Sequence, residues 1–98
     1  MKAIIIEDET AAINSLKAIL RQNSVVDIEV VAELESIEDS VEWLRDSSPP
    51  DIIFMDIHLA DGLAFNIFEQ IEIVAPVVFT TAYDEYALQA FRVSSIDY

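Results

Sequence analysis

Short apolar segments alternate along this chain with longer amphipathic ones, and this alternation restricts the fold more than any other feature. Segments 2–6, 51–55 and 76–79 are nearly unbroken apolar runs rich in β-branched residues. Such runs are typical of strands that are covered on both faces in a parallel sheet. Segment 25–34 carries polar interruptions and indicates a more exposed strand, and 96–98 indicates the opening of a fifth.

Helical patterns separate these strands. Apolar residues at spacings of three and four predict an amphipathic helix over 10–22. The S-x-x-D pattern that begins at Ser36 predicts the start of a second helix, which the following Pro-Pro pair ends. Helical spacing recurs over 63–71, where Gly62 is expected to turn the chain into the helix, and again over 84–92.

Strands that alternate with helices of this length predict an α/β fold: a doubly wound parallel sheet with right-handed crossovers and helices on both faces. We predict the flavodoxin-like strand order 2-1-3-4-5. In open sheets of this kind, ligands bind outside the carboxyl ends of the strands, near the point where the strand order reverses. The residues that follow the strands are therefore the candidates for chemistry.

Composition removes many alternatives. The chain has 98 residues, enough for one domain, and its formal net charge of −14 opposes contact with nucleic acid and anionic membranes. The absence of cysteine excludes disulfides and thiolate chemistry, and a single histidine excludes histidine-cluster metal sites. A single glycine excludes a P-loop and a GxGxxG dinucleotide fingerprint. Basic partners and metal ions remain.

The sequence predicts a cytoplasmic location. The longest stretch without a charged residue, 73–83, has eleven residues, whereas a helix that crosses a bilayer needs about 20. Near the N-terminus, the apolar run 3–6 is too short for a secretory signal. No contact with a membrane is expected.

Polar side chains follow three of the predicted strands. They are Glu7 and Asp8 after the first strand, Asp56 after the third, and Thr80 and Thr81 after the fourth. If the first and third strands are neighbours, three carboxylates converge at one edge of the sheet with no basic residue of the chain close by. Crowded carboxylates repel one another and raise their own pKa values unless a cation is present. A bound divalent ion would be the simplest way to offset this repulsion.

Oxygen donors without nitrogen or sulfur suit Mg²⁺, which accepts one or two carboxylates and favours phosphate as a further ligand. Mn²⁺ could substitute. A metal ion held by Asp8 and Asp56 would leave coordination positions open for a phosphoryl group. The pattern therefore predicts metal-assisted phosphoryl transfer, with Asp56 as the nucleophile and the Thr81 hydroxyl bonding a phosphoryl oxygen.

Three motifs, in this order, resemble one protein family. Segments 3–9 (AIIIEDE), 50–59 (PDIIFMDIHL) and 76–83 (PVVFTTAY) look like the receiver domain of bacterial two-component response regulators. Segments 82–91 and 96–98 further resemble receivers of the LytTR type. The resemblance spans the whole chain and implies a part in a phosphorelay.

The resemblance also implies a role for each acidic residue. Asp56 would accept a phosphoryl group from a sensor histidine kinase. Asp8 would bind Mg²⁺ directly, and Glu7, which stands where many family members have Asp, would bind it mainly through water. Asp56 and the backbone carbonyl of His58 would complete the metal shell.

A conformational switch is implied as well. Thr81 would be the switch hydroxyl, and Tyr98 the aromatic residue whose rotamer changes with it. Phosphorylation would thereby control an output domain, with transcription as the regulated process. A chain with this role is not expected to be an enzyme.

The end of the chain departs from the family pattern. Receivers of this kind continue past the position of Tyr98 with a basic residue, the rest of strand five and a fifth helix, so residues 1–98 are expected to form a C-terminally incomplete receiver. DNA binding would need an output domain that these residues do not supply. An unpaired sheet edge and uncovered apolar surface predict self-association, with a dimer as the expected form.

Two other functions stay open on the residues alone. One is a protein interaction module that is not phosphorylated, which the missing basic residue favours. Taken alone, Glu7 and Asp8 could be a solvated strand end, and Tyr98 could serve packing. A Mg²⁺-dependent phosphatase of the haloacid dehalogenase type also uses an Asp nucleophile. Those enzymes carry a D-x-D motif directly after the first strand, and Glu7, Asp8 and Glu9 do not match this motif.

Overall fold

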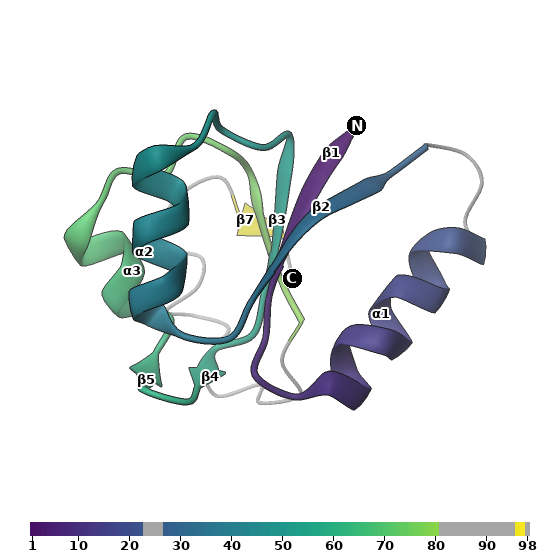
Figure 1. The fold of residues 1–98 in the computed structure, drawn as a ribbon, viewed down its shortest axis with the longest axis horizontal. Coiled ribbons are helices and arrows are strands. Elements are labelled where there is room, and N and C mark those ends of the chain that lie inside the picture. Colours follow the sequence, from purple (N-terminus) through teal and green to yellow (C-terminus); the bar gives the residue numbers. More distant parts are fainter. Residues whose placement is uncertain (23–26, 81–95, 98) are drawn as a thin grey trace.

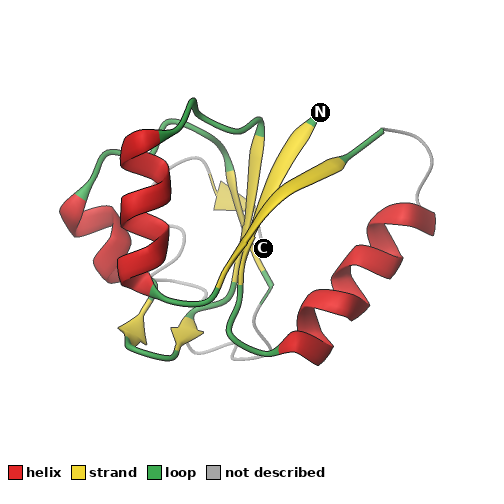
Figure 2. Ribbon diagram, in the orientation of Figure 1, coloured by secondary structure: helices red, strands yellow, loops and turns green. Residues whose placement is uncertain are grey.

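The computed structural model describes residues 1–22, 27–80 and 96–97, which form a five-stranded parallel sheet with helices on both faces (Figure 1, Figure 2). The strands of this sheet are β1 Lys2–Ile6, β2 Glu29–Leu34, β3 Ile52–Met55, β6 Val77–Phe79 and β7 Ile96–Asp97. They lie in the order β2-β1-β3-β6-β7, and every neighbouring pair is parallel. With β6 and β7 as the fourth and fifth strands, this confirms the predicted order 2-1-3-4-5.

Helices lie on both faces of the sheet. They are α1 Thr10–Gln22 on one face, and α2 Ile37–Asp46 and α3 Phe65–Gln70 on the other (Figure 1). In β1, Ala3 and Ile5 pack with Ile13 of α1 in one core. Ile4 and Ile6 belong to a second core beneath α2 and α3. The unbroken apolar run of β1 is thus explained, because alternate side chains supply two separate cores.

The first two helices begin and end where the sequence predicts. Helix α1 has the predicted bounds, and its Ile13 is buried. At the start of α2, the Ser36 hydroxyl accepts a hydrogen bond of 3.0 Å from the backbone N–H of Asp39, as the S-x-x-D pattern predicts. Helix α2 ends at Asp46, ahead of the two prolines.

The segment that follows β3 differs from the prediction. Gly62 does not begin a helix; it begins the second strand of a small antiparallel ribbon, formed by β4 His58–Leu59 and β5 Gly62–Leu63. The next helix, α3, begins only at Phe65. The reason is burial: Ile57 and Leu59 lie in the core beneath α2 and α3, so this stretch runs extended before the chain can turn.

The ends of two further predicted elements differ or lie outside the described residues. The second strand begins at Glu29, so residues 27–28 are not part of it, and residues 25–26 lie outside the described part of the chain. The predicted helix over 84–92 also lies outside it. In the described ranges, no helix combines the length and apolarity that a membrane span requires.

Candidate functional site

Backbone hydrogen bonds bring the ends of three strands to the same level. The N–H of Glu7 donates to the carbonyl of Leu34 at 2.9 Å, and the N–H of Asp56 donates to the carbonyl of Ile6 at 2.9 Å. The N–H of Thr80 likewise donates to the carbonyl of Met55 at 3.0 Å. Each residue that follows a strand therefore continues the ladder of its neighbour, which places the acidic residues side by side at one edge of the sheet.

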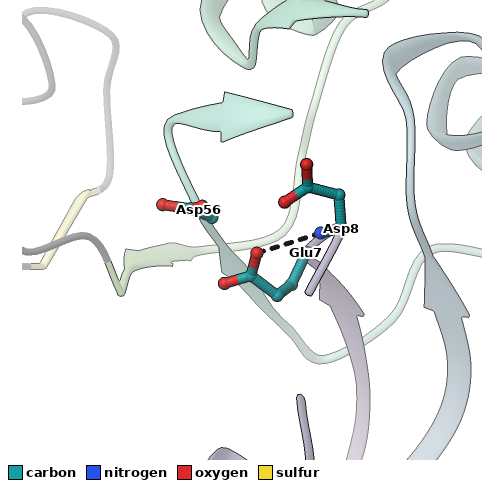
Figure 3. A group of neighbouring side chains, drawn as sticks. All are labelled: Glu7, Asp8 and Asp56. Carbon is teal, nitrogen blue, oxygen red and sulfur yellow. Dashed lines mark hydrogen bonds between the residues drawn. The ribbon is translucent and has the colours of Figure 1, made fainter. Parts of the chain in front are cut away.

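Three carboxylates meet at this edge. One carboxylate oxygen each from Glu7, Asp8 and Asp56 lies within 4.8 Å of the others (Figure 3). Glu7 is buried, with only 8% of its surface exposed, whereas Asp56 is half-buried and Asp8 is exposed. The cluster therefore has one wall inside the protein and one side open to solvent.

Two of the three carboxylates are held by neighbouring backbone amides. Glu7 Oε2 accepts a hydrogen bond of 2.9 Å from the N–H of Asp8, drawn in Figure 3, and one of 3.3 Å from the N–H of Glu9. Asp56 Oδ1 accepts one from the N–H of Ile57 at 2.8 Å. These bonds leave one carboxylate oxygen on each side chain without a backbone donor among the described residues.

The cluster is uncompensated by basic side chains. Lys17 of α1 forms an ion pair with Glu33 of β2 at 2.7 Å. Among residues 1–22, 27–80 and 96–97, no lysine or arginine pairs with the three carboxylates. Burial raises the pKa of Glu7 from 4.5 to about 7, and the negative charge of Asp56 adds to the rise. The direction of this shift agrees with the predicted effect of crowding, with burial as the larger cause.

Glu7→Gln is expected to remove a pH dependence of folding stability. Because the folded-state pKa of Glu7, about 7, lies above its ordinary 4.5, the folded state holds this proton more tightly than the unfolded chain does. Its contribution is complete below the ordinary pKa and is lost as the pH rises through the folded one. In metal-free buffer, the wild type should therefore lose stability relative to Glu7→Gln across this window.

Urea unfolding in the presence of EDTA, followed by the fluorescence of the single tryptophan, Trp43, measures this difference at each pH. The expected result is a difference curve that bends between the two pKa values. Difference curves that stay flat would mean that Glu7 titrates alike in the folded and unfolded chain.

The donor chemistry of the cluster fits a hard divalent cation. Carboxylate oxygens are the ligands that Mg²⁺ prefers, and a positive charge at their centre would favour the ionised form of Glu7. His58 begins β4 two residues after Asp56, and its side chain is exposed. Its backbone carbonyl as a metal ligand stays a prediction.

The remaining predicted site residues fall at the end of β6 and at the end of the chain. Thr80 is exposed and, with Glu7, lines a hollow of about 240 Å³ beside α1. Thr81 and Tyr98 lie outside the described residues. Asp61, whose carboxylate accepts hydrogen bonds from the first turn of α2, is not among the predicted site residues. Its one local signal is the Asp-Gly pair, which is typical of a tight hairpin turn.

Comparison with known families decides between the open interpretations. The model of the response regulator receiver domain matches residues 3–98. The chain belongs to this family. The receiver assignment accounts for the strand order and the acidic cluster together, and it favours neither the haloacid dehalogenase interpretation nor the unphosphorylated module.

Individual relatives agree with this assignment. The receiver is 40% identical, over 101 aligned residues, to the sensory transduction protein LytT of Bacillus cereus, and 36% identical to the transcriptional regulatory protein LytR of Staphylococcus aureus. Each alignment covers the whole of this chain and 40% of the relative, so the chain spans about two fifths of their length. The predicted LytTR-type receiver is thereby confirmed.

A solved structure agrees as well. The response regulatory domain of the protein mrkE from Klebsiella pneumoniae superposes with a TM-score of 0.76 at 31% identity. The match covers 97% of this receiver and 78% of that chain. The fold class predicted from the alternation of strands and helices is thus confirmed.

Proposed function

We propose that this receiver accepts a phosphoryl group on Asp56 from the phosphohistidine of a sensor kinase. The observation that supports this most strongly is the meeting of Glu7, Asp8 and Asp56, whose oxygens lie within 4.8 Å of one another at the ends of β1 and β3. Of the three, Asp56 is the one that follows the central strand β3 and is half-buried, so a phosphoryl group on it would touch the body of the domain.

The local contacts of Asp56 suit a nucleophile. The N–H of Ile57 holds Oδ1, which orients the carboxylate and leaves Oδ2 to attack phosphorus. A new bond forms between Oδ2 and phosphorus while the bond between phosphorus and the donor nitrogen breaks. The departing imidazole takes up a proton from water. Ile57, fully buried, anchors the backbone beside the reacting carboxylate.

Charge dictates the need for a cation. A phosphoryl group that approaches this edge meets carboxylates of the same charge; the charge of Asp56 adds to burial in raising the pKa of Glu7. Bound Mg²⁺ would neutralise phosphoryl oxygens and hold the group in line with its nucleophile. Asp8, Asp56 and the carbonyl of His58 would hold it directly, and Glu7 through water. Because Asp8 is exposed, an ion held there would be accessible from solvent.

The switch residues are assigned from their places in the sequence. Thr81 follows Thr80, whose N–H extends the ladder between β6 and β3. Tyr98 follows β7, the neighbour of β6. We assign Thr81 to the bond with the phosphoryl group and Tyr98 to the rotamer change that follows.

The output is proposed from the relatives. They are described as sensory transduction and transcriptional regulatory proteins, and they are longer than this chain. In the whole protein, we expect phosphorylation of the receiver to favour a dimer and thereby to change the activity of a transcriptional output domain. Contacts with DNA would fall to that domain, because the net charge of −14 opposes them in the receiver.

Removal of divalent cations tests the role of the acidic cluster. With acetyl phosphate as the donor, electrophoresis that retards phosphoproteins should show labelling in Mg²⁺. EDTA should slow it at least about tenfold, because the charge at the cluster is then uncompensated. Mn²⁺ should restore the rate after chelation. Equal rates with and without EDTA would contradict the metal-dependent mechanism, and no labelling in any condition would contradict the phosphoacceptor function itself.

A further inference from the structure

The turn of the β4–β5 hairpin is bound to the start of helix α2. Asp61 lies in the two-residue turn between Leu59 and Gly62. Its Oδ1 accepts a hydrogen bond of 2.8 Å from the N–H of Ile37, and its Oδ2 one of 3.2 Å from the N–H of Glu38. One carboxylate from a hairpin thus binds the first turn of a helix that lies more than twenty residues earlier in the chain.

These bonds complete the cap of α2. The first N–H groups of a helix have no partner inside the helix and need acceptors from elsewhere. Ser36 accepts from Asp39 through its hydroxyl and from Ser40 through its carbonyl. The two N–H groups that remain in the first turn, those of Ile37 and Glu38, are the ones that Asp61 accepts. The bond from Ile37 also lowers the pKa of Asp61, so the carboxylate is charged at neutral pH.

A second contact between the hairpin and the same helix is the close packing of Gly62 against Ile37. Gly62 has a φ of +142°, and a Cβ atom there would lie 3.2 Å from Cδ1 of Ile37. A side chain at this position would therefore be strained, and the side chain of Ile37 would have to shift to make room for it. The close packing of Gly62 and the two hydrogen bonds of Asp61 therefore act on the same part of the protein, the first turn of α2.

The hairpin and α2 link the backbone at Asp56 to the backbone at Glu7. This link is additional to the direct pairing of β1 with β3. From Asp56, the chain runs through Ile57, whose carbonyl accepts a bond of 2.7 Å from the N–H of Ala64 and so closes the base of the hairpin. From the other side, α2 joins the end of β2, where the carbonyl of Leu34 accepts the N–H of Glu7. Figure 1 shows the hairpin and the start of α2 at the same edge of the sheet.

We propose that Asp61 is a positioning residue for the acidic site. By tying the hairpin turn to the first turn of α2, it holds the backbone of Asp56 and His58 at a fixed place relative to Glu7 and Asp8. This inference rests on the proposed function, because it concerns the geometry in which the same carboxylates bind Mg²⁺. Asp61 itself touches neither the metal position nor the phosphoryl group.

Titration calorimetry with Mg²⁺ alone tests this role without any phosphorylation. Asp61→Ala is expected to raise the Mg²⁺ dissociation constant by about tenfold, the effect typical of lost support behind a metal ligand. Asp61→Asn keeps an acceptor for Ile37 only, so a smaller rise is expected. If Asp61→Ala does not fold, as judged by circular dichroism, the Asn variant decides, and an unchanged constant overturns the proposal.

Ser36→Ala is the matched control. It removes a side-chain cap from the same helix turn but leaves the hairpin bound. It should lower the unfolding midpoint without changing the Mg²⁺ dissociation constant. An equal change in Ser36→Ala and Asp61→Ala would show that Asp61 acts only by stabilising α2, and would overturn the proposal.

Labelling with acetyl phosphate separates this inference from the proposed function. In Asp61→Ala, labelling should need a higher Mg²⁺ concentration and should reach the wild-type level at saturation. If the wild type is labelled and Asp61→Ala binds Mg²⁺ with normal affinity, the positioning role alone is refuted. A wild type that binds Mg²⁺ but is never labelled would refute the phosphoacceptor function and leave the positioning role standing.

Discussion

Asp56→Asn should abolish phosphorylation of this receiver: we expect labelling by acetyl phosphate in Mg²⁺ to fall by at least about 100-fold, the scale of loss when a nucleophile is removed. The amide has nearly the shape of the carboxylate, so the bond to the N–H of Ile57 can be kept. Its oxygen lacks the charge that attacks phosphorus. The variant should also lower the pKa of Glu7, because the negative charge of Asp56 is one cause of its rise.

Asp46→Asn is the control for this experiment. Asp46 is exposed at the last residue of α2, away from the carboxyl ends of the strands, and the substitution removes the same charge. It should be labelled like the wild type. Mass spectrometry of peptides from the wild type should place the added phosphoryl group on Asp56. Labelling of Asp56→Asn as strong as that of the wild type would falsify the assignment of the nucleophile.

Ile53→Ala should cost about 2–5 kcal/mol of unfolding free energy, the range for truncation of a buried Ile or Leu. Ile53 is fully buried in β3, where it lies opposite Ile4 of β1 and Val77 of β6. Truncation leaves a cavity beneath α2 and α3 that the rigid sheet cannot close. Domains of this size have a total stability of about 5–15 kcal/mol. The loss is therefore a large share of the whole, and urea unfolding followed by Trp43 fluorescence measures it.

Ile19→Ala removes the same atoms from an exposed place. Ile19 lies on α1 with 60% of its surface exposed. Its truncation should change the unfolding free energy by less than about 1 kcal/mol, as is usual for surface positions. Similar losses in Ile19→Ala and Ile53→Ala would show that β3 is not the centre of the core that the sheet order implies.

Long, regular patterns allowed much of the fold to be predicted. Strand β1 and helix α1 have the predicted bounds. The continuous β-branched run of β1 does not fit an amphipathic helix, and the apolar spacing of three and four in α1 does not fit a strand. The ribbon of β4 and β5 was not predicted. Strands of two residues have no periodicity of their own, and this ribbon exists because Ile57 and Leu59 are drawn into the core.

The site divides in the same way. From the sequence alone, one could place Glu7, Asp8 and Asp56 at strand ends and deduce that they would meet if the strands were neighbours. Their separation, the burial of Glu7 and its pKa of about 7 depend on how β1 and β3 pair and on what covers them. Thr81 and Tyr98 remain predictions from the sequence.

The sequence by itself determined the class of fold, the edge of the sheet that carries chemistry and the kind of ion that suits it, because side-chain periodicity and donor type are local properties of the chain. Only the tertiary structure decided that Glu7 is the buried acid, that the chain after Asp56 forms a hairpin, and that Asp61 caps α2. Each of these depends on contacts between residues far apart in sequence, whose burial and hydrogen bonds exist only once the elements have packed.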